Sequence, residues 1–392
     1  MRAFVDNLGR LRERIDRSAH LILVFKADAY GHGASELLPY ARRAGVSAFA
    51  LASVGEALEL RKRGANDRLL VLGTTFSGEL EAALDAKLEL VVSSSAQLLE
   101  LIALERDVAV HLHFDTGMHR LGLDPKVAGP IARVLGEAPW IRVRGLMTHV
   151  AGTRGAFDRR AREQVAKFEA LARELSAKGA LPRDAWCHVA STAGVLTGLG
   201  GHFQAVRVGM GAFGLLPHRE LDVCLGADPL EPVLSLRARV AQTHRLAAGQ
   251  HVGYDGTWRA RRPSWIATVA AGYADGLSVR LSDRGSALIQ GRRVPIVGRV
   301  SMDYAALDVT DLALEGLPRV TEGTPVTFLG KDGDESIDAW ELGDHLGTGP
   351  YEVITSIQAR VPRILRRTDD LAFDEPQPSV SITEPALPPT SR

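Results

Sequence analysis

Short apolar runs alternate with amphipathic stretches over the first half of the chain. The clearest amphipathic stretch is 158–178, where Val165, Phe168, Leu171 and Leu175 recur at three- and four-residue steps, as on one face of a helix. Eight apolar runs, each followed by a helical or linking segment, predict a parallel (β/α)8 TIM barrel over residues 1–216. The eight predicted strands are 21–29, 48–53, 69–73, 88–94, 109–115, 141–149, 185–191 and 205–214.

An open doubly wound sheet is the alternative for this half. A Gly-rich turn of the G-x-G-x-x-G type after the first strand would favour it, and the segment after 21–29 has no such turn.

The pattern changes after Gly214. Apolar runs punctuated by Gly and Pro, with few helical stretches, predict a mostly antiparallel β domain over 217–366. Five prolines among the last 17 residues, with Ser, Thr and Glu, predict a disordered tail at 367–392. The β-like runs are 236–246, 266–273, 286–300, 305–310 and 325–330.

Composition narrows the class of protein. Of 392 residues, 45% are hydrophobic and 24% charged, as in globular enzymes, and Lys plus Arg balance Asp plus Glu at 47 each. No net field therefore favours nucleic acid or an anionic membrane as a partner. Two cysteines argue against a disulfide framework. Acidic residues interrupt the first 16 positions, so we expect no secretory signal and a cytoplasmic location.

Lys26 is the first candidate for chemistry. It lies in the apolar run VFKADAYGHG (24–33), where an unpartnered ammonium is costly to bury. Two interpretations follow: an edge strand with Lys26 in water, or a lysine desolvated for Schiff-base chemistry, which needs a lowered pKa. Near the carboxyl end of a first barrel strand, Lys26 would lie on the face where such barrels act. Tyr30 and His32 follow in a Gly-flanked loop.

The same run resembles the signature of alanine racemases, whose lysine binds pyridoxal phosphate as a Schiff base. Further resemblances follow in order and span residues 4–364. They are DTGMHRLG (115–122), GLMTH (145–149), VRVGMGAFG (206–214), GYADG (272–276), VPIVGRVSMD (294–303) and YEVITSIQARVPR (351–363).

The resemblance implies a pyridoxal 5′-phosphate site at the barrel. Arg207 matches the arginine that faces the pyridine nitrogen; a guanidinium stays protonated and cannot pass a proton to that nitrogen, so the ring becomes a weaker electron sink. His149 matches an imidazole packed against the ring. The residues that match the phosphate cradle are Tyr30, Thr192, Gly209, Met210 and Tyr351.

The resemblance also implies a second catalytic residue, Tyr273, because racemisation removes a proton from one face of the α-carbon and returns one on the other. In the family this tyrosine comes from the second domain of the other subunit, which implies a homodimer with shared sites. Arg120, Met302 and Asp303 match residues at the substrate carboxylate. We therefore expect interconversion of L- and D-alanine, with D-alanine destined for peptidoglycan.

Three positions depart from the family pattern. His113 lies where many relatives have a carbamylated lysine whose negative charge holds the arginine equivalent to Arg120. Ser191-Thr192 replaces the usual Asn-Ser. The chain also starts almost inside the first helix, which leaves two interpretations: a start that lies upstream, or a second domain without its edge strand.

Three alternatives remain at this point. His111, His113 and Asp115 lie on one side of a strand by period 2 and could bind a metal, although metal-dependent barrel hydrolases carry such a pair on the first strand. A single-domain carrier of pyridoxal phosphate would need neither GYADG nor VSMD. A racemase of broader specificity, or one acting on serine, is the nearest enzymatic alternative.

Overall fold

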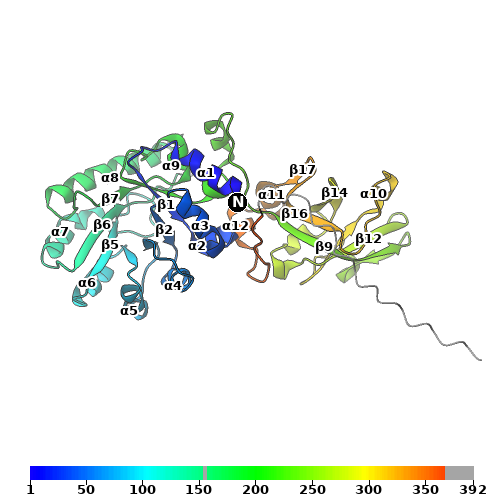
Figure 1. Cartoon of the computed structure of the whole chain (residues 1–392), viewed down its shortest axis with the longest axis horizontal. Helices are drawn as coiled ribbons and strands as arrows, with labels where there is room; N and C mark the ends of the chain where they lie inside the picture. Colours follow the sequence, from blue (N-terminus) through cyan, green and yellow to red (C-terminus); the bar gives the residue numbers. More distant parts are fainter. Residues whose placement is uncertain (153–156, 367–392) are drawn as a thin grey trace, which may run out of the picture.

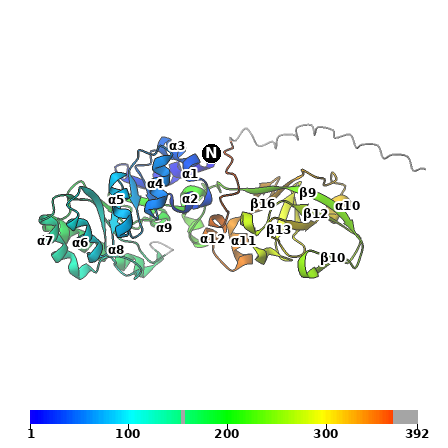
Figure 2. The same cartoon turned by 90° about the horizontal axis from the view of Figure 1, so that it is seen from below.

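A computed structural model describes residues 1–152 and 157–366, so the tail predicted at 367–392 lies outside the described residues. Two lobes lie end to end along the long axis, the first built from the N-terminal half of the chain and the second from β-strands (Figures 1 and 2). Helices from both ends of the chain, α1 (Arg2–Arg12) and α12 (Pro350–Thr355), lie where the lobes meet.

The first lobe is a closed parallel barrel in the order β1 to β8, which confirms the predicted TIM barrel. Pairing of His20 with Ala205 and of Leu21 with Val206 joins the last strand to the first. Strands buried on both faces read as continuous apolar runs, which is why eight runs in the sequence corresponded to eight strands. They are His20–Val24, Ala48–Leu51, Leu69–Val71, Glu89–Val92, Val108–His113, Ile141–Met147, Trp186–His188 and Ala205–Val208.

Helices surround the barrel. The predicted helix at 158–178 is α8 (Arg159–Ala177), which buries its apolar face and is capped by the Asp158 side chain. The other helices after barrel strands are the short α2 (Lys26–Gly31), α3 (Ala34–Arg43), α4 (Val54–Lys62), α5 (Ser77–Asp85), α6 (Ser95–Ala103), α7 (Ala128–Gly136) and α9 (Thr192–Thr197).

Helix α1 packs against the segment that follows β8. Phe4 stacks on Phe213 with ring centroids 5.8 Å apart. The buried Asn7 amide donates to the carbonyls of Ala212, at 3.3 Å, and Glu231, at 2.8 Å. The region after residue 216 therefore lies against the barrel before the chain enters the second lobe.

The second lobe contains an antiparallel sheet in the order β14-β13-β16-β9-β12-β15, with β17 paired to β16. A bridge between Ile296 and Leu307 follows β14 and brings its end of the sheet to β15. This confirms the predicted antiparallel domain. Its strands are β9 (Leu236–Leu246), β10 (His251–Val252), β11 (Trp258–Arg259), β12 (Ser264–Val269), β13 (Ser286–Ile289), β14 (Arg292–Pro295), β15 (Ala305–Asp308), β16 (Pro325–Asp332) and β17 (Glu335–Ile337), with helices α10 (Thr310–Leu314) and α11 (Ala339–Leu346).

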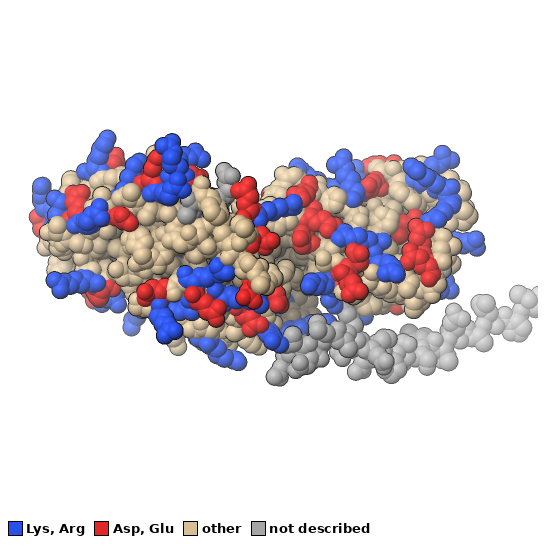
Figure 3. Space-filling model, turned by 90° about the horizontal axis from the view of Figure 1, so that it is seen from above, with Lys and Arg blue, Asp and Glu red and all other residues tan. Residues whose placement is uncertain are grey.

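Charged side chains of both signs are intermixed over both lobes on the face drawn in Figure 3, as the balanced composition leads one to expect. No helix within residues 1–152 and 157–366 combines the length and hydropathy needed to cross a bilayer.

Candidate active site

Lys26 lies just beyond the first barrel strand. Strand β1 ends at Val24, and Lys26 opens α2 (Lys26–Gly31), a short turn in which Ala27, Asp28, Ala29 and Tyr30 all have φ between 51° and 54°. A left-handed turn of four non-glycine residues costs about 1–2 kcal/mol per residue. Surrounding contacts must therefore hold it.

Carboxylates supply part of this support. Glu56 of α4 accepts hydrogen bonds from the backbone N–H of Ala27, at 2.8 Å, and of Ala52, at 2.7 Å. Asp28 accepts one from the N–H of Ala34 at 2.7 Å, which ties the turn to the start of α3. The turn is thus fixed to two helices and to the segment after β2.

Residues 350–363, from the second half of the chain, also contact this turn. Gly31 packs so tightly on α12 that a Cβ there would come within 2.3 Å of the Ile354 carbonyl oxygen. The Arg363 guanidinium donates to the Gly31 carbonyl at 2.9 Å. Only glycine fits at position 31, and residues 350–363 from the far end of the sequence complete the surroundings of Lys26.

The Lys26 side chain is exposed at the mouth of the barrel rather than enclosed in a strand. Its surroundings still lower the pKa of the amine, chiefly through partial burial and then through the charge of Arg120, while Glu56 acts in the opposite direction. Of the two interpretations, the edge strand is wrong, because β1 has a hydrogen-bonded neighbour on both sides, and Lys26 lies just beyond the end of that strand. An amine with a lowered pKa is suited to Schiff-base chemistry.

The loops after β7 and β8 form a small polar cradle. The Thr192 hydroxyl accepts from the N–H groups of Gly209, at 3.4 Å, and Gly211, at 3.3 Å. A Cβ on Gly209 would come within 2.6 Å of the Tyr30 hydroxyl oxygen. Glycine at 209 therefore keeps a hydroxyl and backbone N–H groups close together, a set of donors suited to phosphate.

Aromatic side chains line the cradle. The rings of Tyr30 and Tyr351 lie 6.2 Å apart between centroids, and Lys26 Nζ lies 5.9 Å from the Tyr30 ring. Burial raises the pKa of Tyr30, and it raises the pKa of Tyr351 to about 12, so both phenols remain donors at neutral pH. Met210 is buried at the start of the 3₁₀ helix Met210–Phe213. The structure thus brings the five predicted cradle residues and Lys26 together.

Arg207, in β8, is fully buried below the cradle. Its Nη1 lies 2.8 Å from His188 Nδ1 and donates to the His188 carbonyl at 2.7 Å. Its Nη2 donates to the carbonyls of Thr148 and Val189 and lies 3.2 Å from His149 Nδ1. Burial lowers the Arg207 pKa to about 10, which leaves it charged at neutral pH. Burial and the neighbouring cations lower the pKa of His149 to about 3, so that imidazole is neutral.

His113 is neutral as well. Burial and the charge of Arg207 lower its pKa to about 4, and its Nδ1 lies 3.1 Å from the Ser93 hydroxyl. Arg120 is exposed nearby, at the end of a loop whose backbone N–H groups donate to the Asp115 carboxylate. His113 therefore brings no negative charge to Arg120.

The three residues considered as metal ligands each have other contacts. His111 lies between Glu89 and His188, His113 contacts Ser93, and Asp115 accepts three backbone N–H groups of its own loop. Within residues 1–152 and 157–366, no cluster of three His, Cys, Asp or Glu residues has the arrangement of a metal site.

Tyr273 belongs to the second lobe. It opens a 3₁₀ turn, Tyr273–Asp275, and its N–H donates to the Ser301 carbonyl at 3.0 Å. A Cβ on the preceding Gly272 would come within 2.3 Å of the Met302 carbonyl oxygen, so glycine is required for this close approach. The GYADG and VSMD segments therefore form one unit, which we call the tyrosine loop: residues 272–276 with 300–303.

An arginine fastens this loop. Arg360 donates to Asp275 at 2.7 Å and to Asp303 at 2.8 Å. Asp275 in turn accepts from the Gly272 N–H at 2.9 Å. These hydrogen bonds hold the loop, yet the residues Tyr273 and Met302 are 43% and 53% exposed.

Two parts of the chain match family models. Residues 1–217 match the alanine racemase N-terminal domain, and residues 233–365 match the alanine racemase C-terminal domain. The chain belongs to the alanine racemase family. It is therefore an isomerase, and the single-domain carrier is not favoured, since the C-terminal domain matches too.

Individual alanine racemases resemble the chain over almost their whole length. Those of Desulfosudis oleivorans and Sorangium cellulosum are 36% and 37% identical over 375 and 356 residues, which cover 92% and 88% of this chain and 94% and 90% of the relatives. The crystal structure of the Bacillus anthracis alanine racemase with bound L-Ala-P superimposes with a TM-score of 0.85 at 34% identity, covering 93% of each chain. That of Bartonella henselae, with covalently bound pyridoxal phosphate, gives 0.80 at 28% identity, covering 93% of this chain and 97% of the other.

Sequence reasoning missed several residues that organise the alanine racemase site. Glu56, which holds the turn after Lys26, lies in a helix with no motif around it, and no pattern in the sequence pointed to it. Arg360 and Arg363 lie inside the motif at 351–363, so this resemblance was the signal available for them. His188 and Glu89 each lie within an apolar run, and no pattern in the sequence pointed to them.

Proposed function

We propose that the protein interconverts L-alanine and D-alanine with pyridoxal 5′-phosphate held on Lys26. The observation that carries this proposal is the convergence, at one end of the barrel, of a lysine with a lowered pKa, a cradle of hydroxyl and N–H donors, and a buried arginine. Family membership supplies the reaction class, and the barrel residues fit the cofactor.

The cofactor would be held by Lys26 and by donors around its phosphate. Thr192, Gly209, Met210, Tyr30 and Tyr351 would surround the phosphate, and Ser191, in place of the family's asparagine, offers a shorter side chain beside it. His149 would pack against the ring, and Arg207 would face the pyridine nitrogen. Bound there, pyridoxal phosphate supplies the electron sink that makes the α-proton of an amino acid removable.

Lys26 and Tyr273 would act as the two bases. The lowered pKa of Lys26 increases the fraction of free amine available to take a proton. Tyr273 is exposed on a rigid loop of the second lobe, and in a homodimer that loop would enter the barrel mouth of the other subunit. The two bases would then face opposite sides of the α-carbon, as inversion requires.

The substrate carboxylate would be bound by Arg120 and the tyrosine loop. Arg120 is exposed beside Lys26, and its charge lowers the pKa of that lysine. The carboxylate of Asp303 already pairs with Arg360 and would repel a second carboxylate. We therefore assign the contribution of Met302 and Asp303 to their main chain. The product would serve peptidoglycan synthesis in the cytoplasm.

A spectrum and a coupled assay test this function. Purified protein supplied with pyridoxal phosphate should absorb at the violet edge of the visible range, convert L-alanine to D-alanine, and carry the cofactor on Lys26 after borohydride reduction. Testing L-serine as the substrate in the same assay distinguishes an alanine racemase from a racemase of broader specificity or one that acts on serine. Lys62→Ala, which changes an exposed lysine of α4, is the matched control and should leave all three results unchanged. Trapping on another lysine, or failure to make D-alanine, would contradict the proposal.

A further inference from the structure

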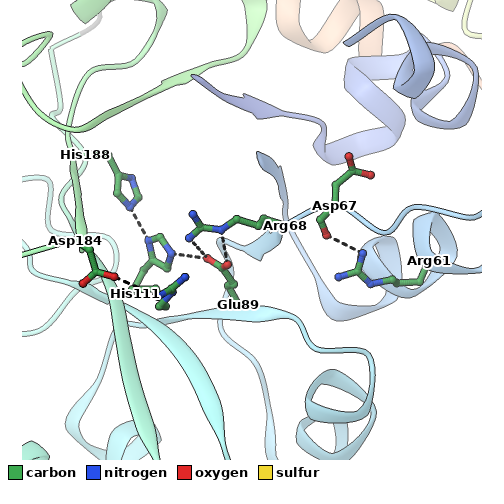
Figure 4. Close-up of polar contacts among 8 residues, drawn as sticks. Arg61, Asp67, Arg68, Glu89, His111, Asp184 and His188 are labelled. Carbon is green, nitrogen blue, oxygen red and sulfur yellow. Dashed lines mark hydrogen bonds and ion pairs between the residues drawn. The ribbon is translucent and has the colours of Figure 1, made fainter. Parts of the chain in front are cut away.

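A row of polar side chains crosses the interior of the barrel (Figure 4). His188 Nε2 lies 2.8 Å from His111 Nδ1, and His111 Nε2 lies 2.8 Å from the Glu89 carboxylate. Arg68 closes the row with two hydrogen bonds to Glu89, at 2.6 and 2.9 Å. At the other end, His188 Nδ1 meets Arg207 Nη1 at 2.8 Å.

The row runs from one end of the barrel to the other. Arg68 directly precedes β3 and Glu89 opens β4, so both lie at the amino ends of the strands, where their side chains are 28% and 11% exposed. His188 closes β7, and Arg207 is the third of four residues in β8, close to the carboxyl ends. Both histidines between them have no exposed surface. A carboxylate near solvent is thereby connected to the arginine of the proposed site.

Only one placement of the ring hydrogens of His111 and His188 satisfies every hydrogen bond in this row. Glu89 is ionised, because hydrogen bonds from His111 and Arg68 outweigh the effect of burial and lower its pKa to about 2. An ionised carboxylate only accepts, so His111 carries its hydrogen on Nε2 and its Nδ1 accepts from His188 Nε2. His188 Nδ1 is then bare and accepts from Arg207.

The reversed order fails at both ends. A hydrogen on His188 Nδ1 would point at an Arg207 N–H 2.8 Å away, and a bare His111 Nε2 would face a carboxylate oxygen at 2.8 Å. Burial lowers the pKa of both histidines: at His188 the charge of Arg207 adds to this effect, and at His111 burial outweighs the opposite effect of the Glu89 carboxylate, so neither ring takes up a second proton at neutral pH. The arrangement therefore selects one tautomer for each ring.

We propose that Glu89, acting through His111 and His188, is a positioning residue that orients Arg207 and compensates its buried charge from the opposite end of the barrel. Each hydrogen bond in the row polarises the next, so the carboxylate makes His188 Nδ1 a better acceptor for the guanidinium. Arg207 gains this support without a carboxylate next to it that would compete for its N–H groups. The catalytic consequence rests on the proposed contact between Arg207 and the cofactor, whereas the placement of hydrogens does not.

Nitrogen NMR on histidine-labelled protein tests the row directly. At pH 7, with pyridoxal phosphate bound, His111 and His188 should both carry hydrogen on Nε2 and have a bare Nδ1. Their signals can be assigned by single substitutions of each histidine. A hydrogen on Nδ1 of either ring, or a doubly protonated ring, would overturn the proposal, whatever the racemase assay gives.

Glu89→Gln tests the catalytic consequence. Its amide cannot accept at both oxygen positions, so the ordered tautomers should become mixed, and kcat should fall about tenfold or more with KM for L-alanine nearly unchanged. Glu89→Asp keeps the carboxylate and should recover part of the loss. The control Asp85→Asn removes an exposed carboxylate of α5, paired to Arg106, and should leave kcat and both tautomers as they are.

The outcomes separate the possibilities. A fall in kcat with unchanged tautomers, or mixed tautomers with unchanged kcat, would contradict the positioning role. If Glu89→Gln does not fold, Arg68→Lys replaces it: the carboxylate then still accepts from His111, so both tautomers should persist and kcat should change by less than about threefold. Absence of D-alanine formation in the unsubstituted protein would refute the proposed function and leave the tautomer measurement valid.

Discussion

Lys26 and Tyr273, the two proposed bases, lie in surroundings of opposite kinds. Around Lys26 the barrel supplies helices, strand ends and the returning C-terminal segment, and the polar groups beneath it are buried and hydrogen-bonded. Around Tyr273 the backbone is held as firmly, by Ser301, Asp275 and Arg360, yet the side chain projects from the surface. One chain thus builds a candidate cofactor site and, separately, a hydrogen-bonded loop with exposed side chains.

This contrast explains why an exposed phenol can be useful. A residue that acts in the site of another subunit needs a fixed backbone and an exposed side chain. A mobile backbone would not position the side chain accurately, and a buried side chain could not contact the other subunit. The tyrosine loop meets both conditions. The barrel mouth, where Lys26 is exposed, is open to such a side chain.

The largest expected effects come from removing each of the two proposed bases separately. Lys26→Ala and Tyr273→Phe should each lower kcat by about 10² to 10⁴, the usual range for loss of a positioned acid or base. If the site is shared, mixing the two inactive chains should restore roughly a quarter of the original activity, because half of randomly formed dimers contain one site with both residues.

Mass spectrometry should confirm that subunits have exchanged before the mixture is assayed. As a control, two preparations of the same Lys26→Ala chain should recover nothing on mixing. No recovery from the Lys26→Ala and Tyr273→Phe mixture after confirmed exchange would show that the two bases act within one chain.

The next effect concerns the fixed backbone of the tyrosine loop. Arg360→Ala removes the hydrogen bonds to Asp275 and Asp303, so the loop should loosen and kcat should fall by about tenfold, since small misplacements at a reacting group are costly. Arg292→Ala, which removes an exposed pair with Glu315 at 3.0 Å, is the matched control in the same lobe and should change kcat little. Equal effects from the two substitutions, measured by steady-state kinetics, would argue against a role for loop order.

A smaller effect, on KM, is expected from a substitution in the barrel. His113 gives Arg120 no anionic neighbour, so His113→Lys should lower KM for L-alanine if the new lysine becomes carbamylated. The gain should be about two- to fivefold, the range of an ion pair in partly exposed surroundings. Mass spectrometry can detect the carbamate, and His113→Gln is the neutral control. A carbamylated variant with unchanged KM would show that Arg120 needs no anion.

The smallest effect should come from bicarbonate. A lysine at position 113 would need carbon dioxide to become carbamylated, whereas a neutral imidazole has no amine to carbamylate. We therefore expect the same kcat/KM for L-alanine in bicarbonate-depleted buffer. The assay should be repeated without chloride: sensitivity to chloride alone would show an ion in the place of the carbamate, and sensitivity to bicarbonate would refute the prediction.

The sequence predicted the barrel well, because strands buried on both faces leave continuous apolar runs. It placed the strand ends less well. The first run was expected to continue to Ala29, whereas β1 ends at Val24 and Lys26 begins a left-handed turn. That turn goes against the local preference of four residues. Besides its own Asp28, it is held by Glu56 and Arg363, whose hydrogen-bond partners in the turn lie 29 and 332 positions away along the chain.

Resemblance predicts candidate site residues where motifs are dense, and it gives no signal for the row of Arg68, Glu89, His111 and His188. His111 was noticed for its spacing and considered as a metal ligand. Its actual neighbours come from two other strands, and only the closed barrel brings Glu89 and His188 to its two ring nitrogens. Periodicity shows which side of a strand a residue lies on, and it carries no information about which residue of a distant strand lies opposite.

The contact of residues 350–363 with the Lys26 turn also has a consequence for biosynthesis. The barrel strands leave the ribosome first, but Tyr351, Ile354 (the neighbour of Gly31) and Arg363 follow only when most of the second domain has been translated. At ordinary elongation rates this is a delay on the order of 10 s. A nascent barrel has Glu56 and Asp28 but lacks the contacts of Ile354 and Arg363, so we expect the strained turn to be held completely only in the finished chain.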